Sequence, residues 1–80
     1  MSTQTSANGI DLSAPNGASE LDAHVRRKLA GRVRDFQLLI TVEGIVLRGD
    51  SHTYYAKQLA QHLVMAAVDV PIRANEIVVV

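Results

Sequence analysis

The chain has 80 residues, of which 48% are hydrophobic and 20% charged, and its formal net charge at pH 7 is zero. These values indicate one small globular domain and argue against a strongly basic nucleic-acid-binding chain. The sequence contains no cysteine, which excludes disulfides and a thiolate metal site.

The first segment, residues 1–19, is rich in Ser, Thr, Asn, Gly and Ala and has no periodic apolar face. Such a composition buries too little surface to offset chain entropy, so we expect a disordered N-terminal tail. The segment lacks the basic start and apolar run of a signal peptide, and no window of the chain reads as a transmembrane helix. The sequence therefore predicts a cytoplasmic protein whose folded domain is residues 20–80.

A first helix is expected to begin at Ser19, which can cap it, with Asp22 as an acid in the first turn. Apolar residues then recur at helical spacing, at Leu21, Val25 and Leu29. Gly31 marks its expected end.

A β-hairpin follows, because "FQLLITV" and "IVLRG" flank Glu43-Gly44. Gly44 supplies the positive φ that a two-residue hairpin loop needs. A loop at these two residues would pair the apolar side chains of the two strands, Val42 with Ile45 and Ile40 with Leu47.

The stretch "RGDSH", Arg48 to His52, contains an Arg-Gly-Asp triplet and consecutive Asp, Ser and His. Consecutive residues at a helix start point in different directions and cannot converge as a catalytic triad. An adhesion motif would need an exposed loop on an exported protein. We interpret the stretch as the boundary between a strand and a helix, with Asp50 or Ser51 as the helix cap.

A second helix is predicted over residues 52–67. Its inward side is expected to carry Tyr55, Ala56, Leu59, Ala60, Leu63 and Ala67, and its outward side Tyr54, Lys57, Gln58, Gln61, Val64 and Met65. Pro71 breaks the chain before a last strand, "IRANEIVVV". The order predicts an α+β domain of αββαβ type, with two helices packed on one face of a three-stranded mixed sheet.

The segments "EGIVLRGDSHTYYAKQLAQHLV" and "NEIVV" resemble the BON domain, a small phospholipid-binding module of bacterial proteins. The matching positions are Gly44, Ile45, Leu47, Gly49, Ser51, Leu59, Ala60, Asn75, Ile77 and Val79. The resemblance covers residues 20–80 and implies two helices on a three-stranded mixed sheet. Asp69 and Arg73 depart from it, since the family more often has Gly and Val there.

The basic run "HVRRKLAGRVR" holds the first candidate binding residues, Arg26, Arg27, Lys28, Arg32 and Arg34. Basic groups near an anionic lipid surface gain about 1 kcal/mol each. The alternatives are a solvated helix end, where cations suit the helix dipole, and weak RNA binding.

Exposed apolar positions form a second candidate surface, with Tyr54, Val64 and Met65 on the outward side of the second helix. Leu39, Val46 and Val78 are expected on the open face of the sheet. If the terminal "IVVV" strand lies at a sheet edge, it can pair with a second copy to form a homodimer.

His24, His52 and His62 lack metal-ligand spacing, and no glycine-rich phosphate loop or paired carboxylates are visible. We therefore expect no enzyme, metal or cofactor. Nucleic acid is an unlikely partner, because the Gly-x-x-Gly loop of a KH domain is missing. The resemblance to the BON domain implies a non-enzymatic binding module for anionic phospholipid or a protein partner, and a self-associating structural domain is the alternative.

Overall fold

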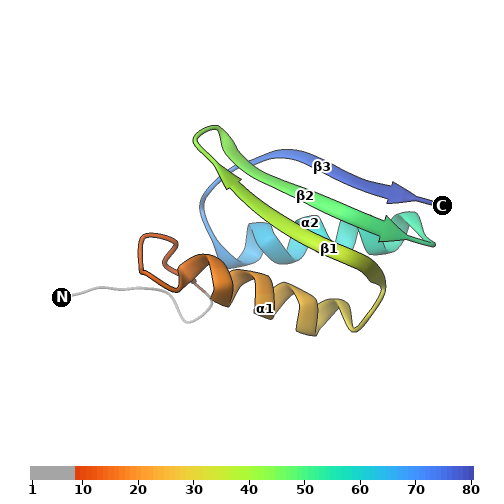
Figure 1. Ribbon diagram of the computed structural model, residues 1–80, viewed down its shortest axis with the longest axis horizontal. Helices are drawn as coiled ribbons and strands as arrows, with labels where there is room; N and C mark the ends of the chain where they lie inside the picture. Colours follow the sequence, from red (N-terminus) through yellow and green to blue (C-terminus); the bar gives the residue numbers. More distant parts are fainter. Residues whose placement is uncertain (1–8) are drawn as a thin grey trace.

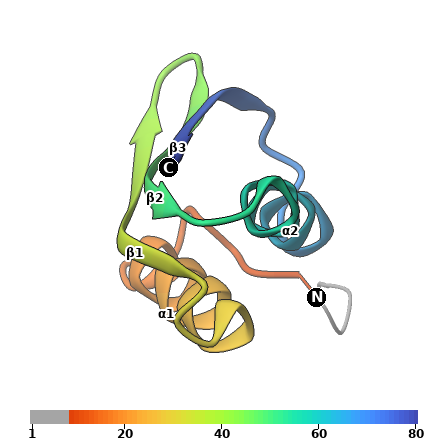
Figure 2. The same cartoon turned by 90° about the vertical axis from the view of Figure 1, so that its right-hand side faces the viewer.

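The computed structural model describes residues 9–80 as a three-stranded sheet with two helices on one of its faces (Figures 1 and 2). The central strand, β2, pairs antiparallel with β1 and parallel with β3. This arrangement confirms the predicted α+β fold. In chain order the elements are α1 (Gly17–Leu29), β1 (Val33–Thr41), β2 (Gly44–Ser51), α2 (Tyr54–Ala67) and β3 (Ile72–Val79).

The hydrophobic core lies between the sheet and the helix layer. Two small residues of α2, Ala56 and Ala60, face the sheet and let the helix approach it closely. Burying each larger side chain contributes about 1.5–3 kcal/mol, so the core is the main stabilising feature of this small domain. Its larger members are Leu21, Val25, Leu29, Val33, Phe36, Ile45, Leu47, Val64 and Ile77.

Helix α1 begins at Gly17 rather than at the predicted Ser19, and Asn16 occupies the N-cap position without a side-chain hydrogen bond. Its predicted apolar stripe is buried as expected. The helix ends at Leu29, and its C-cap is Ala30, which adopts a left-handed conformation (φ 53°) and donates its N–H to the Arg26 carbonyl. The C-cap is therefore one residue before Gly31.

Part of the predicted tail is packed on the domain. Ile10 and Leu12 lie against the core, and the Ile10 N–H donates to the Ala67 carbonyl at the end of α2, at 2.9 Å. The Ser13 hydroxyl, and then the Ser13 N–H, donate to the Asp11 carboxylate and lower the pKa of Asp11. The expectation of a disordered tail is wrong for this segment; residues 1–8 lie outside the described part of the chain.

The hairpin forms, but its predicted register is wrong. Ile40 pairs with Ile45 instead of Leu47, and the loop is Val42-Glu43, with Val42 fully exposed. Leu47 pairs with Leu38. The predicted apolar face of β1 is therefore covered by the helices only near Phe36. Towards the loop its side chains become exposed, because the hairpin extends beyond the helices (Figure 2).

The loop position follows from the approach of Pro71 to Gly44. A Cβ atom at Gly44 would lie 2.5 Å from the Pro71 carbonyl oxygen, which accepts the N–H of Ile45 at 2.9 Å. Gly44 (φ 134°) is thus needed inside the strand rather than in the loop. Thr41 stabilises the turn, since its hydroxyl donates to the Gly44 carbonyl at 2.7 Å.

The "RGDSH" stretch lies mostly within a strand. Arg48 to Ser51 belong to β2, and the buried Ser51 donates its hydroxyl to the Thr53 carbonyl at 2.8 Å. The cap of α2 is Thr53, whose hydroxyl oxygen accepts the N–H of Ala56 at 3.1 Å. The structural interpretation of the stretch is confirmed, while the predicted caps, Asp50 and Ser51, are wrong.

The predicted faces of α2 are correct except at two positions. Val64 was expected outward and is 0% exposed, whereas Tyr55 was expected inward and is 65% exposed. The buried residues of α2 are Ala56, Ala60, Val64 and Ala67, which follow helical spacing. Leu59 and Leu63 are partly buried against the core.

Candidate binding surface at one end of the domain

Most of the predicted basic residues gather at one end of the molecule. This end contains the C-terminus of α1, the start of β1 and the N-terminus of α2, and it faces the viewer in Figure 2. Arg27 and Lys28 belong to the last turn of α1, Arg32 follows that helix, and Arg34 lies in β1. All four side chains are exposed, and together they are called the basic end.

Arg26 belongs to the same run but is occupied within the molecule. It forms an ion pair with Asp22 at 3.0 Å, and its guanidinium lies 5.6 Å from the centre of the Phe36 ring. The same guanidinium donates to the Phe36 carbonyl. Arg26 therefore attaches α1 to β1, and its charge is partly neutralised.

Unlike Arg26, the charged groups of the basic end are not held in ion pairs within residues 9–80. Arg32 donates to the Leu29 carbonyl at 3.2 Å, which helps to close the C-terminus of α1. Cations at a helix C-terminus are favourable, so the folded helix tolerates this concentration of charge.

Two further features set the potential at this end. The first turn of α2 has no acidic residue, so no side chain of that turn offsets the positive end of its dipole, although the negative end of the α1 dipole lies at the same end of the molecule. Asp35 and Asp50 also lie at this end of β1 and β2 and reduce the excess of positive charge. The net result is a moderately positive end on a chain whose formal charge is zero.

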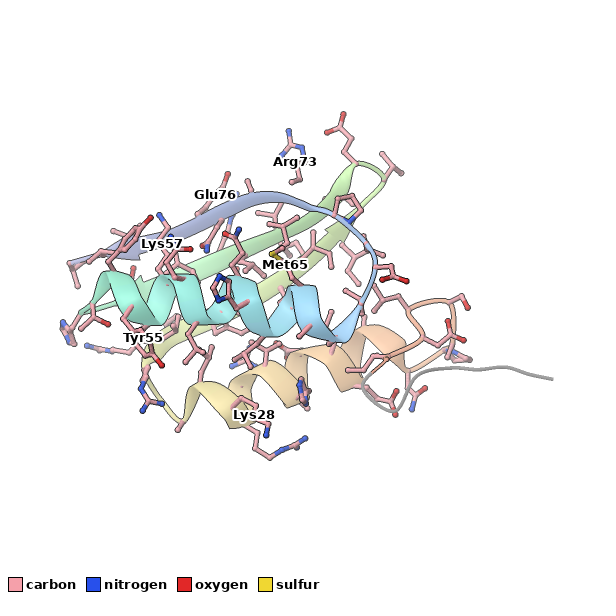
Figure 3. All side chains as sticks on the ribbon, turned by 180° about the vertical axis from the view of Figure 1, so that it is seen from behind. Lys28, Tyr55, Lys57, Met65, Arg73 and Glu76 are labelled. Carbon is pink, nitrogen blue, oxygen red and sulfur yellow. The ribbon has the colours of Figure 1, made fainter. Side chains whose placement is uncertain are left out.

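Two aromatic side chains lie at the same end of the molecule as these cations. Tyr54 and Tyr55 open α2 and are both mostly exposed. Gln58 donates to the Tyr54 hydroxyl at 2.6 Å, which orients that ring. Figure 3 shows Tyr55 and Lys28 on the side of the helix layer that faces away from the sheet.

Met65, the remaining predicted contact residue, is not part of this end. It lies near the C-terminus of α2, on the side that faces β3 (Figure 3). Tyr55 was missed as a surface residue. The spacing of Ala56, Ala60 and Val64 is the signal that could have found it, because that stripe leaves Tyr55 off the sheet-facing side.

The open face of the sheet is more polar than predicted. Leu39, Val46 and Ala74 form one row across the strands, but Val46 is buried. Two exposed ion pairs join β3 to its neighbours, Glu76 with Arg48 of β2 at 2.9 Å and Arg73 with Glu43 of the hairpin loop at 2.6 Å. This face therefore presents no continuous apolar surface to a partner.

Comparisons with protein-family models, with curated proteins and with solved structures found no match to this chain. In the part of the chain that the structure describes, no helix is long and apolar enough to cross a membrane. Nor do residues 9–80 bring three or more His, Cys, Asp or Glu side chains together as a metal site.

Proposed function

We propose that this domain is a non-enzymatic binding module that attaches to anionic phospholipid surfaces through its basic end. The observation that carries the proposal is that four exposed cations and two exposed tyrosines lie at the same end of a molecule whose formal net charge is zero. Lysine and arginine attract anionic headgroups, and tyrosine favours the boundary between headgroups and acyl chains.

The expected affinity is modest. Each basic group near an anionic surface contributes about 1 kcal/mol, so four contribute about 4 kcal/mol, which alone corresponds to a dissociation constant near 1 mM. Insertion of the tyrosine rings adds to this, while Asp35 and Asp50 oppose it. Binding should be reversible and should weaken as salt screens the charges.

The resemblance of residues 20–80 to the BON domain is part of this proposal. The segment that carries the resemblance includes Tyr54 and Tyr55, and the basic run precedes it on α1 and β1. A cytoplasmic location is proposed with it, since the cytoplasmic leaflet is the one rich in anionic lipid.

The test is co-sedimentation with phosphatidylcholine vesicles, with and without phosphatidylserine. We expect binding only to the anionic vesicles. Replacing Arg27 and Lys28 by Gln should weaken it about 30-fold, because two contributions of about 1 kcal/mol are lost.

The matched control is the double variant Arg48→Gln/Arg73→Gln, which removes the same charge from the exposed ion pairs on β2 and β3. It should bind anionic vesicles nearly as well as the parent chain. Equal losses in both variants would show that net charge alone matters. Absence of binding to either vesicle would reject the lipid role and direct the search to protein partners.

A further inference from the structure

The two edges of the sheet are protected to different degrees. In β1 the pairing register with β2 shifts between Arg34 and Gln37, and Asp35 has a positive φ of 55°. The Arg26 guanidinium also occupies the Phe36 carbonyl. Bulges and side chains that engage the backbone hinder edge-to-edge pairing, so the first part of the β1 edge, residues 33–36, is protected.

The outer edge of β3 has less protection. Within residues 9–80 no strand pairs with it. The Val80 N–H donates to the Ser51 carbonyl of β2 at 2.8 Å. Because backbone groups alternate along a strand, those of Val78 also point at β2, and those of Ile77 and Val79 point outwards. The Asn75 side chain accepts the Ile77 N–H at 3.2 Å. Among the described residues, this is the one side-chain hydrogen bond to an outward-pointing backbone group of β3.

The same edge carries exposed apolar side chains at its end. Val78, Val79 and Val80 are 53%, 43% and 68% exposed. The irregular part of β3 is its start, where the register with β2 shifts between Ile45 and Val46. Residues 74–80 therefore form a regular edge whose last three residues are exposed and apolar, and an edge of this kind can template pairing with another strand.

We propose that this edge pairs antiparallel with the same edge of a second copy, centred on Ile77. Ile77 is the midpoint of the regular segment 74–80, so this register uses all of it. Asn75 then lies opposite the partner's Val79, and Glu76 opposite the partner's Val78. Centring on Glu76 would place two carboxylates side by side, which destabilises a sheet.

The second copy is favoured as occupant because the segment is complementary to itself in this register. Each outward-pointing residue meets an outward-pointing residue, and such a pair exchanges both of its backbone hydrogen bonds. On pairing, the Ile77 N–H loses its hydrogen bond to the Asn75 side chain and donates instead to a backbone carbonyl of the second copy. Val78 and Val79 become covered by the neighbouring strand, and both helix layers lie on the same side of a continuous sheet.

The dimer should be weak, since a single strand pair lies at the small end of specific interfaces. Sedimentation equilibrium should show the average mass rising towards the dimer between roughly 10 μM and roughly 1 mM. This association rests on backbone hydrogen bonds and apolar contact, so salt should affect it little, in contrast to lipid binding.

A matched pair of variants tests the edge. Val79→Pro removes an outward N–H that the monomer does not use, whereas Val79→Thr keeps that N–H and a similar shape. We expect about a tenfold or greater loss of association for Val79→Pro and about a threefold change or less for Val79→Thr. Far-UV circular dichroism should show both variants folded, and both should bind anionic vesicles like the parent monomer.

The register is tested with single cysteines, which the parent chain lacks. A mixture of Glu76→Cys and Val78→Cys chains should form mixed disulfides under mild oxidation, because these positions face each other. Val78→Cys alone should cross-link much more slowly. Rapid cross-linking of Val78→Cys alone would overturn the register. A strict monomer at high concentration, or equal association of the two Val79 variants, would overturn the dimer.

Discussion

At the residue scale, the start of α2 shows why local sequence leaves a helix cap undecided. Asp50, Ser51 and Thr53 all have side chains suited to capping. The choice among them depends on where β2 ends, and β2 continues to Ser51 because that residue pairs with Val33 and Val79 in the two neighbouring strands. The cap is therefore fixed by contacts distant in sequence, which the local pattern does not contain.

Thr53→Ala should lower the free energy of unfolding by about 0.5–2 kcal/mol, because it removes the acceptor for the Ala56 N–H. Urea unfolding followed by circular dichroism measures this loss. Asp50→Ala is the control and should change stability by less than about 0.5 kcal/mol. A larger loss for Asp50→Ala than for Thr53→Ala would contradict the assignment of the cap.

At the element scale, the apolar periodicity predicted each helix and strand, but not how the strands align. Leu21, Val25 and Leu29 were correctly placed in the core because one face of a helix follows from spacing alone. The hairpin register depended on Pro71, which follows α2 and approaches Gly44 only in the folded sheet. An alternating apolar pattern fits two registers that differ by two residues equally well.

The pairing of β1 with β2 depends on Gly49. A Cβ atom at this position would lie 2.7 Å from Val33 Cγ1 and 2.9 Å from the Arg34 carbonyl oxygen, at a φ of 148°. Gly49→Ala should therefore destabilise the domain by about 2–4 kcal/mol, from backbone strain and overpacking together.

Gly31→Ala is the matched control, because Gly31 also has a positive φ (84°) but no neighbouring atom within 4 Å of an added Cβ. It should cost about 1 kcal/mol, the strain without the clash. Urea unfolding of both variants separates the two contributions. Equal losses of unfolding free energy in the two variants would show that the close approach of β1 to Gly49 does not contribute to the cost of Gly49→Ala.

At the scale of the whole molecule, the folded unit begins earlier than the apolar pattern suggests. Ile10 and Leu12 stand among polar residues and carry no periodicity, so composition alone assigned them to a tail. The surface that they cover, near Ala67, exists only after the helices and the sheet have assembled.

Removing residues 1–13 should therefore lower the free energy of unfolding by about 2 kcal/mol, since two apolar side chains lose their partial burial. Hydrogen exchange at the C-terminal turn of α2 should also become faster, because the Ala67 carbonyl loses the Ile10 N–H. Unchanged urea unfolding and exchange after this truncation would show that the segment contributes nothing.

The candidate site was also predicted in part. The basic run is visible in the sequence, and the fold keeps Arg27, Lys28, Arg32 and Arg34 together. The sequence gives no sign that Arg26 is occupied, because its partner Phe36 comes from the following strand. Met65 and Tyr54 lie at opposite ends of α2, and the predicted helix over residues 52–67 already implied this separation.

The position of β3 in the chain has a consequence for synthesis on the ribosome. Helix α1, the β1–β2 hairpin and α2 are built from residues close in sequence and can form as the nascent chain emerges. Strand β3 is translated after them, and it supplies Ile77, one of the most buried side chains of the core. Until β3 emerges, β2 has an unpaired side and the core has a gap. The interval between the translation of α2 and that of β3 is therefore when the nascent chain most needs protection from pairing with other strands.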